Sequence, residues 1–173
     1  PRSMDPLPPS SARVPPPTQG IGDAFDLLES IADGVLVIDV DRLKDINDAH
    51  GHAVGDLALQ HVARILQRTV RGGDVLGRPD DRVVGRWAGD EFLVVMAPAT
   101  APGLDALTHR LLAAVRRAPL VLEAGGELPI TVTIGAAGGR PDPSALLGAA
   151  DRALYRAKRR SRDAACVEHL GEP

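Results

Sequence analysis

The sequence predicts one domain of mixed helical and strand structure, organised around a β-hairpin. Residues 83–84 and 92–96 favour strands, and the small residues Ala88 and Gly89 between them are typical of a turn. A second apolar segment, residues 34–40, predicts another strand. Segments with helical periodicity lie before, between and after these strands. We therefore expect a sheet with helices packed around it.

The other elements follow from apolar periodicity and from turn residues. A short helix is expected from Gly22 towards the first strand, a short helical turn ends near Gly51, and a longer helix begins near Ala53. Further along, we expect a loop at 98–103, a helix at 104–117, a turn around 124–126, a strand at 130–137, a helix from 143 or 144 to about 160, and an edge strand at 164–167.

Composition narrows the class of protein. The chain has 173 residues, of which 44% are hydrophobic but only 2% aromatic, so the core must be built from aliphatic side chains. A formal charge of −3 argues against a nucleic-acid-coating protein. The single cysteine, Cys166, excludes an intramolecular disulfide. No apolar run reaches the roughly 20 residues of a membrane helix. We expect a cytoplasmic domain with no nucleic-acid partner and no membrane segment.

The N-terminal segment differs from the rest of the chain. Residues 1–20 hold seven of the fifteen prolines and cannot form a regular helix. We interpret them as a poorly ordered linker or cloning remnant, and residues 21–173 as the folded domain. No signal-peptide pattern opens the chain.

Acidic residues stand at the ends of two predicted strands. Asp90 and Glu91 follow the hairpin turn directly, and the strand at 34–40 runs into Asp39-Val40-Asp41. If the two strands are neighbours, Asp39 and Asp90 lie side by side, where hard oxygen ligands could hold magnesium and the phosphates of a nucleotide. The alternative is an acidic turn that only faces water.

Two further groups of polar residues could recognise a nucleotide. Asn47 and Asp56 lie on two helical pieces joined by a glycine turn, and an amide with a carboxylate matches the donor and acceptor edge of guanine. Alternatively, they are a turn residue and an acid at a helix N-terminus. The basic cluster at 158–162 could meet phosphates, or could simply face water at the C-terminal end of a helix.

Four motifs occur in an order that resembles the GGDEF family of diguanylate cyclases, over residues 34–167. Residues 39–48 with Gly51-His52, Gly55 and Asp56 match the family pattern D-x-D-x-F-K-x-I-N-D…G-H…G-D. The other three are Ala88-Gly89-Asp90-Glu91-Phe92 for the signature hairpin, residues 131–136 for T-x-S-I-G-x, and residues 150–158 for A-D-x-A-L-Y-x-A-K.

The resemblance implies an α+β fold of the nucleotidyl-cyclase type, related to palm and ferredoxin-like folds, with a central, mostly antiparallel sheet surrounded by helices. It also implies roles for individual residues. Mg²⁺ or Mn²⁺ would be held by Asp39, the Val40 carbonyl and Asp90, and guanine would be recognised by Asn47 and Asp56. The triphosphate would lie beside Ala88 and Gly89 and would meet Lys158, Arg162, Lys44 and the amides of Arg42 and Leu43. Glu91 would lie by the reacting 3′-hydroxyl or a second metal.

The implied activity is the condensation of two GTP molecules into cyclic di-GMP with release of two pyrophosphates. Since one site holds one GTP, two copies of the chain would have to meet as a homodimer. An upstream sensor domain or a partner protein could regulate that meeting. Two alternatives remain: a catalytically silent domain that binds GTP or cyclic di-GMP, and another purine cyclase on the same scaffold.

The sequence departs from the family pattern at several positions. Ala88 replaces the first signature glycine, and its methyl group fits only if φ is negative and the ligand leaves room. Ser161 replaces a glycine before Arg162. The family's entrance motif, D-x-L-T-G-L-x-N-R, survives only as Asp5-Pro6-Leu7 and Arg13.

A product-binding motif, R-x-x-D, occurs in many relatives, and Arg71-Gly72-Gly73-Asp74 fits it here. Thirteen residues separate Asp74 from Ala88 where the family has five, so the match implies an eight-residue insertion, which coincides with an apparent duplication in residues 75–86. Arg71 and Asp74 would bind cyclic di-GMP outside the active site. The alternative is that both residues merely end a helix.

Overall fold

The structure is a computed structural model that describes residues 26, 33–71, 82–97, 99–139 and 142–171. The predicted linker at 1–20 and almost all of the predicted helix after Gly22 lie outside these residues. For Arg71, Arg82 and Val83 only the backbone is described.

A five-stranded sheet with the order β2-β3-β1-β6-β7 forms the centre of the fold. Its strands are β1 (Gly34–Val40), β2 (Arg82–Ala88), β3 (Glu91–Met96), β6 (Val132–Gly138) and β7 (Ala165–His169). Strand β1 pairs antiparallel with both β3 and β6, and only β6 and β7 are parallel. The predicted α+β fold with a mostly antiparallel sheet is confirmed, as are the bounds predicted for β1.

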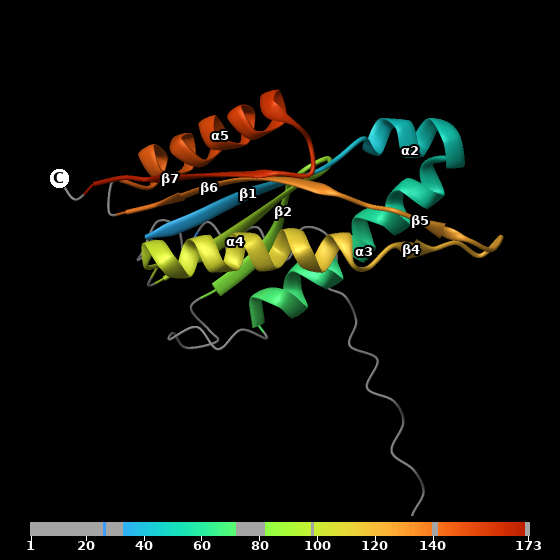
Figure 1. The fold of residues 1–173 in the computed structure, drawn as a ribbon, viewed down its shortest axis with the longest axis horizontal. Helices are drawn as coiled ribbons and strands as arrows, with labels where there is room; N and C mark the ends of the chain where they lie inside the picture. The colour runs from blue at the N-terminus through green and yellow to red at the C-terminus, as the bar shows by residue number, and fades with distance from the viewer. Residues whose placement is uncertain (1–25, 27–32, 72–81, 98, 140–141, 172–173) are drawn as a thin grey trace, which may run out of the picture.

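Helices cover both faces of this sheet (Figure 1). Helix α5 (Pro143–Arg160) lies on one face, and α3 (His52–Arg71) and α4 (Ala101–Arg116) lie on the other. The short α2 (Leu43–His50) follows β1 at the end of the sheet where the β2–β3 turn and the C-terminal end of α5 also lie.

Side chains of β1 alternate between two hydrophobic clusters, as a strand buried on both faces requires. Val35 and Val37 pack with the α5 side, whereas Leu36 and Ile38 pack with the α3 and α4 side. The residue that continues the first set is Asp39. Its position on the α5 face is therefore fixed by the register of the core.

Several element bounds differ from those predicted by one to three residues, among them β7, predicted at 164–167 and found at Ala165–His169. Helix α4 begins at Ala101, inside the predicted loop, because the Thr100 side chain accepts a hydrogen bond from the Gly103 N–H (3.1 Å) and caps the helix. Strand β6 begins at Val132, two residues late. The turn at 124–126 joins two short strands, β4 (Leu120–Val121) and β5 (Glu127–Leu128), which were not predicted because two residues carry no alternating pattern.

Among the described residues, no helix is both long enough and apolar enough to cross a membrane.

Candidate active site

The hairpin turn consists of Gly89 and Asp90, one residue later than predicted, because Ala88 still pairs with Glu91 as the last residue of β2. Gly89 has a φ of 41°, a left-handed value that glycine adopts at low cost. The Arg86 guanidinium donates two hydrogen bonds to the Gly89 carbonyl, from Nε at 3.0 Å and Nη2 at 2.7 Å. The backbone next to the two carboxylates is therefore held in place by the hairpin itself.

The two acidic strand ends meet, as the sequence predicted. Asp39 of β1 stands opposite Glu91 of β3 in the antiparallel register, and the Val40 N–H donates to the Asp90 carbonyl at 3.0 Å. Residues directly opposite each other in an antiparallel pair project to the same face. Asp39 and Glu91 thus both lie on the α5 face, with Asp90 beside them in the turn.

Lys158 of α5 reaches this cluster, and its Nζ lies 2.9 Å from Asp39 Oδ2. Burial raises the pKa of Asp39, and the nearby charge of Asp90 raises it further, although Lys158 acts in the opposite direction. Burial and the charge of Asp39 likewise raise the pKa of Glu91. Several negative charges are thus gathered around one lysine, which is the electrostatic setting of a cation site.

Asp151 is a member of this cluster that the sequence reasoning did not single out. The residue is exposed, but partial burial of its carboxyl group raises the pKa of Asp151, and its charge makes a small contribution to the raised pKa of Glu91. It follows Ala150 at the start of the fourth motif, so its motif position was the one available signal.

The donor set suits Mg²⁺ only if other ligands complete it. Among the described residues, no group of three or more His, Cys, Asp or Glu side chains is arranged to hold a metal by itself. Mg²⁺ in nucleotide sites commonly takes one or two carboxylates and fills its other positions with phosphate oxygens and water. Asp39, Asp90 and the carbonyl of Val40, the last residue of β1, fit that requirement.

Asn47 and Asp56 come from different helices, and Gly55 allows them to approach. A Cβ at Gly55 would lie 1.8 Å from Asn47 Oδ1, so the amide of Asn47 packs directly against this glycine. Gly55 immediately precedes Asp56 in the chain. Asn47 is half-buried and Asp56 is exposed. The structure thus places Asn47 of α2 against α3 at the residue before Asp56, and a shared role in binding one ligand stays a prediction.

The segment that follows β1 has a strained backbone. Arg42 adopts a left-handed conformation (φ 54°, ψ 34°) immediately before α2, and its side chain makes no capping hydrogen bond. The first-turn amides of α2, including that of Leu43, have no partner within their own helix. Such amides attract anions. Lys44, in the same turn, is exposed.

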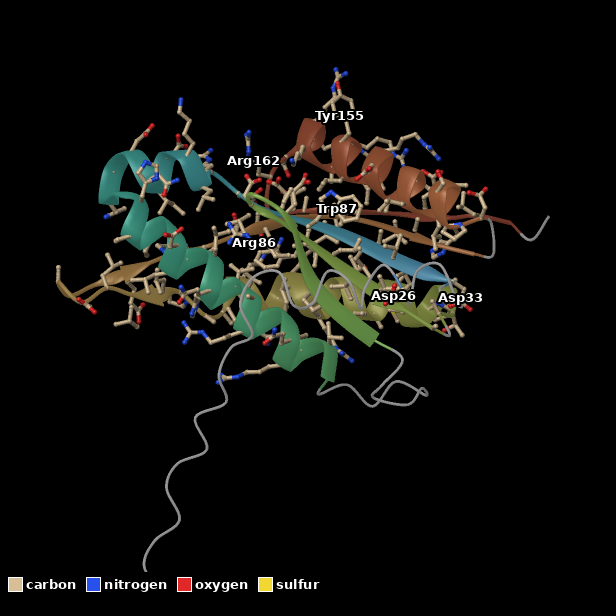
Figure 2. All side chains as sticks on the ribbon, turned by 180° about the vertical axis from the view of Figure 1, so that it is seen from behind. Asp26, Asp33, Arg86, Trp87, Tyr155 and Arg162 are labelled. Atoms are coloured by element: carbon tan, nitrogen blue, oxygen red, sulfur yellow. The ribbon has the colours of Figure 1, made fainter. Side chains whose placement is uncertain are left out.

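Arg162 lies just beyond the C-terminal end of α5. Figure 2 places it between α5 and α2, at one end of the sheet, whereas Asp33 lies at the other end. It is exposed, as are Ala88 and Gly89 of the hairpin. The basic residue, the hairpin turn and the start of α2 thus border the same end of the sheet.

Asp41 belongs to the same strand end but not to the acidic cluster. Its carboxylate accepts hydrogen bonds from the hydroxyl groups of Thr131 (2.7 Å) and Thr133 (2.6 Å) and from the Asp163 N–H (2.9 Å). The residue is 5% exposed. Its hydrogen-bonding capacity is directed at the protein and not at a ligand.

The predicted product site falls largely outside the described residues. Arg71 is the last residue of α3, but its side chain, Asp74 and the segment 72–81 are not described.

The fold and the acidic cluster define a nucleotide-cyclase type of domain, and the comparison with known families agrees. Residues 29–164 match the family model described as "Diguanylate cyclase, GGDEF domain". The chain therefore belongs to the GGDEF family.

Relatives and solved structures are consistent with this membership. The chain is 37% identical over 161 residues to diguanylate cyclase TpbB of Pseudomonas aeruginosa, covering 90% of this chain and 34% of that protein. It thus spans about a third of the relative's length. The crystal structure of the GGDEF domain of TpbB superposes with a TM-score of 0.68 at 34% identity, covering 90% of this chain and 92% of that one. The GGDEF domain of DgcB from Caulobacter crescentus, crystallised with c-di-GMP, gives 0.71 at 25% identity, covering 84% of each chain.

Proposed function

We propose that this domain is a diguanylate cyclase, which condenses two GTP molecules into cyclic di-GMP and releases two pyrophosphates. The observation that carries the proposal is the acidic cluster: Asp39 and Glu91 face each other across β1 and β3, Asp90 adjoins them, and Lys158 bonds to Asp39. Together with family membership, this cluster favours phosphoryl chemistry.

The triphosphate would be held by cations and amides at this end of the sheet. Lys158 and Arg162 would neutralise its charge, with Lys44 in support, and the amides of Arg42 and Leu43 would donate to phosphate oxygens. Ala88, at the end of β2, and Gly89, in the turn, are exposed, which would let phosphate approach the backbone there. These groups hold the α-phosphate still while charge develops on it.

Asp39, Asp90 and the Val40 carbonyl would hold a magnesium or manganese ion. When bound, that ion supplies Lewis-acid stabilisation of the phosphate charge. Glu91 would lie by the 3′-hydroxyl of the nucleotide that attacks. Its raised pKa suits a group that takes up a proton from that hydroxyl.

Asn47 and Asp56 would select guanine. The carboxylate accepts from the ring N–H and the exocyclic amine of guanine, whereas adenine would leave it opposite an acceptor, at a cost of about 1–3 kcal/mol. Gly55→Ala would displace the Asn47 amide and should reduce the preference for GTP over ATP in calorimetry. Gly148→Ala, where the added methyl meets only ordinary contacts, is the matched control. Equal binding of GTP and ATP by the wild type would contradict this role.

Each 3′-oxygen would attack the α-phosphate of the other nucleotide in line, with pyrophosphate leaving. One site carries one GTP, so two copies of the domain must face each other as a transient homodimer. An upstream sensor or a partner protein could control that encounter. We place this reaction in the cytoplasm, the compartment of its substrate GTP.

The proposal is tested by incubating the domain at high concentration with GTP and magnesium and identifying the products by mass. Cyclic di-GMP and pyrophosphate are expected. A domain that binds GTP but forms no product would instead be a silent GGDEF domain, an alternative that Ala88 in the signature favours. A different cyclic purine nucleotide would indicate another cyclase on the same scaffold.

We also propose that Arg71 and Asp74 bind cyclic di-GMP outside the active site. An arginine can stack on guanine and reach its acceptor edge, and an aspartate can accept from its amine. Product bound there would inhibit if it favoured an arrangement in which two active sites cannot meet. Arg71→Ala should relieve inhibition without changing GTP affinity. Identical cyclic di-GMP isotherms for the wild type and this variant would exclude the site.

A further inference from the structure

The three residues after α5 lie at the end of the sheet where the triphosphate is proposed to bind, and they connect α5 to the rest of the fold. Helix α5 ends at Arg160, Ser161 follows as its C-cap, and Asp163 adopts a left-handed backbone conformation with φ 58°. Arg162 lies between them. A non-glycine residue in this region costs about 1 kcal/mol or more and persists only when its surroundings hold it there.

Two groups from different parts of the chain hold Asp163. Its N–H donates to Asp41 Oδ2 at 2.9 Å. Arg116, the last residue of α4, donates from Nε to Asp163 Oδ1 at 2.7 Å and from Nη2 to the Asp163 carbonyl at 2.6 Å. Both the side chain and the backbone of Asp163 are therefore fixed.

The Asp41 end of this arrangement is rigid. Asp41 is buried, and Thr131 and Thr133 bind its two carboxylate oxygens. It also lies two residues after Asp39 on the same strand end. The chain carrying Arg162 is thus attached to the strand end that carries the proposed metal ligand.

The Arg116 end contributes little to stability by ordinary standards. The side chains of Arg116 and Asp163 are 47% and 36% exposed, and ion pairs of that exposure stabilise proteins weakly. The double hydrogen bond to one residue nevertheless restricts the backbone conformation next to Arg162. Its main consequence is expected in the orientation of Arg162.

We propose that Arg116 is a positioning residue for phosphate binding: through Asp163, it fixes the backbone from which Arg162 extends towards the triphosphate of GTP. The inference rests on the proposed function, which supplies GTP as the ligand and Arg162 as a phosphate contact. Arg116 itself touches no nucleotide.

The test compares two ligands that differ only in the phosphates that Arg162 would meet. Calorimetry with magnesium uses 3′-deoxy-GTP, which cannot cyclise, and 3′-deoxy-GMP, which keeps the same base and sugar. Arg116→Ala should weaken binding of 3′-deoxy-GTP by about tenfold, through loss of a well-placed charged hydrogen bond. Binding of 3′-deoxy-GMP should not change.

Three further comparisons sharpen the test. Arg117→Ala is the matched control, because the Arg117 Nε bonds only to the Ala113 carbonyl of its own helix (3.1 Å) among the interactions described, and it should leave both affinities unchanged. Arg116→Lys keeps the charge but cannot donate in the same two-pronged way, so an intermediate loss is expected. In an Arg162→Ala background, Arg116→Ala should cause no additional loss.

Equal weakening of both ligands by Arg116→Ala would mean general damage and would overturn the proposal. Unchanged 3′-deoxy-GTP affinity, or an additive loss in the Arg162→Ala background, would overturn it too. A wild type that binds neither ligand would overturn the proposed function itself, and the positioning role with it.

Discussion

Asp39 and Asp41 are two carboxylates at the end of one strand, and their surroundings are opposite. Asp39 lies near Asp90 and Glu91 and has one cation, Lys158, at 2.9 Å. Asp41 accepts three hydrogen bonds from neutral donors. The ionised form of Asp39 is thus in an electrostatically unfavourable environment, whereas the hydrogen bonds of the Asp41 carboxylate are made within the protein.

The contrast separates a ligand site from its support. A buried carboxylate with raised pKa and like-charged neighbours lowers the stability of the free protein and is retained where a ligand relieves the repulsion. A buried carboxylate with all its hydrogen bonds made inside the protein stabilises one conformation. Changes in the cluster around Asp39 should therefore lower activity without lowering stability, whereas changes around Asp41 should lower stability.

The largest effect is expected for Asp90→Asn. The change removes an anionic metal ligand and keeps the size of the side chain, so cyclic di-GMP formation should fall about a thousandfold or more while the fold persists. Asp105→Asn is the control, since Asp105 pairs with His169 at 3.3 Å, away from the acidic cluster. A folded Asp90→Asn protein that makes product at the wild-type rate would remove Asp90 from the site.

Asp41→Ala should instead destabilise the free protein, by about 3 kcal/mol in urea unfolding, because two hydroxyl groups and one N–H lose a charged acceptor. Asp142→Ala is a matched control: this exposed carboxylate accepts one bond, from the Ala145 N–H at 3.0 Å, as the cap of α5. Its loss should cost about 1 kcal/mol. If the two variants unfold at the same urea concentration, Asp41 is not the support inferred here.

Asp39→Asn should raise the stability of the free protein at pH 7. The folded state raises the pKa of Asp39, mainly through burial, so the stability linked to this group is complete below the ordinary carboxyl pKa and is lost as the pH rises through the raised value. The asparagine variant does not titrate and keeps its stability across that window. Its advantage over the wild type should therefore shrink as the pH falls towards the ordinary carboxyl pKa.

Glu168→Gln should change the stability of the free protein in the opposite direction. Both variants are compared with the wild type by thermal unfolding as a function of pH. Arg156 and Arg152 lower the pKa of Glu168, so its contribution is present above the ordinary carboxyl pKa and is lost as the pH falls through the lowered value. This variant should be slightly less stable at pH 7. Thermal melts without nucleotide or metal in which both variants shift in the same direction would contradict the contrast.

Sequence patterns predicted the acidic cluster better than its support. The apolar run before Asp39 and the turn before Asp90 fix where each strand ends, so their meeting needed only the pairing of β1 with β3. The partners of Asp41, in contrast, lie ninety or more residues away, at Thr131, Thr133 and Asp163. No local pattern encodes such contacts, because they depend on the positions of β6 and of the chain after α5.

Single-residue bounds were also beyond the sequence. The hairpin turn lies at Gly89 and Asp90 because a register shift between Arg86 and Ala88 extends β2 by one residue. Side-chain patterns do not reveal a bulge of this kind. The same holds for Gly55, whose importance depends on the position of the Asn47 side chain in the folded protein.

The smallest effect is expected for Ala88→Gly, which restores the family signature. Among the described non-glycine residues, only Arg42 and Asp163 have positive φ, so Ala88 meets the first condition for accepting a methyl group. It is exposed and ends a strand. Cyclase activity of Ala88→Gly should therefore stay within about threefold of the wild type.

Gly89→Ala is the contrasting variant: at φ 41° an added methyl strains the turn by about 1 kcal/mol and should lower activity more, even though no atom crowds the site. A large gain in cyclase activity from Ala88→Gly would show that the methyl group of Ala88 crowds the phosphate. It would favour the alternative that the domain with alanine at this position is catalytically silent.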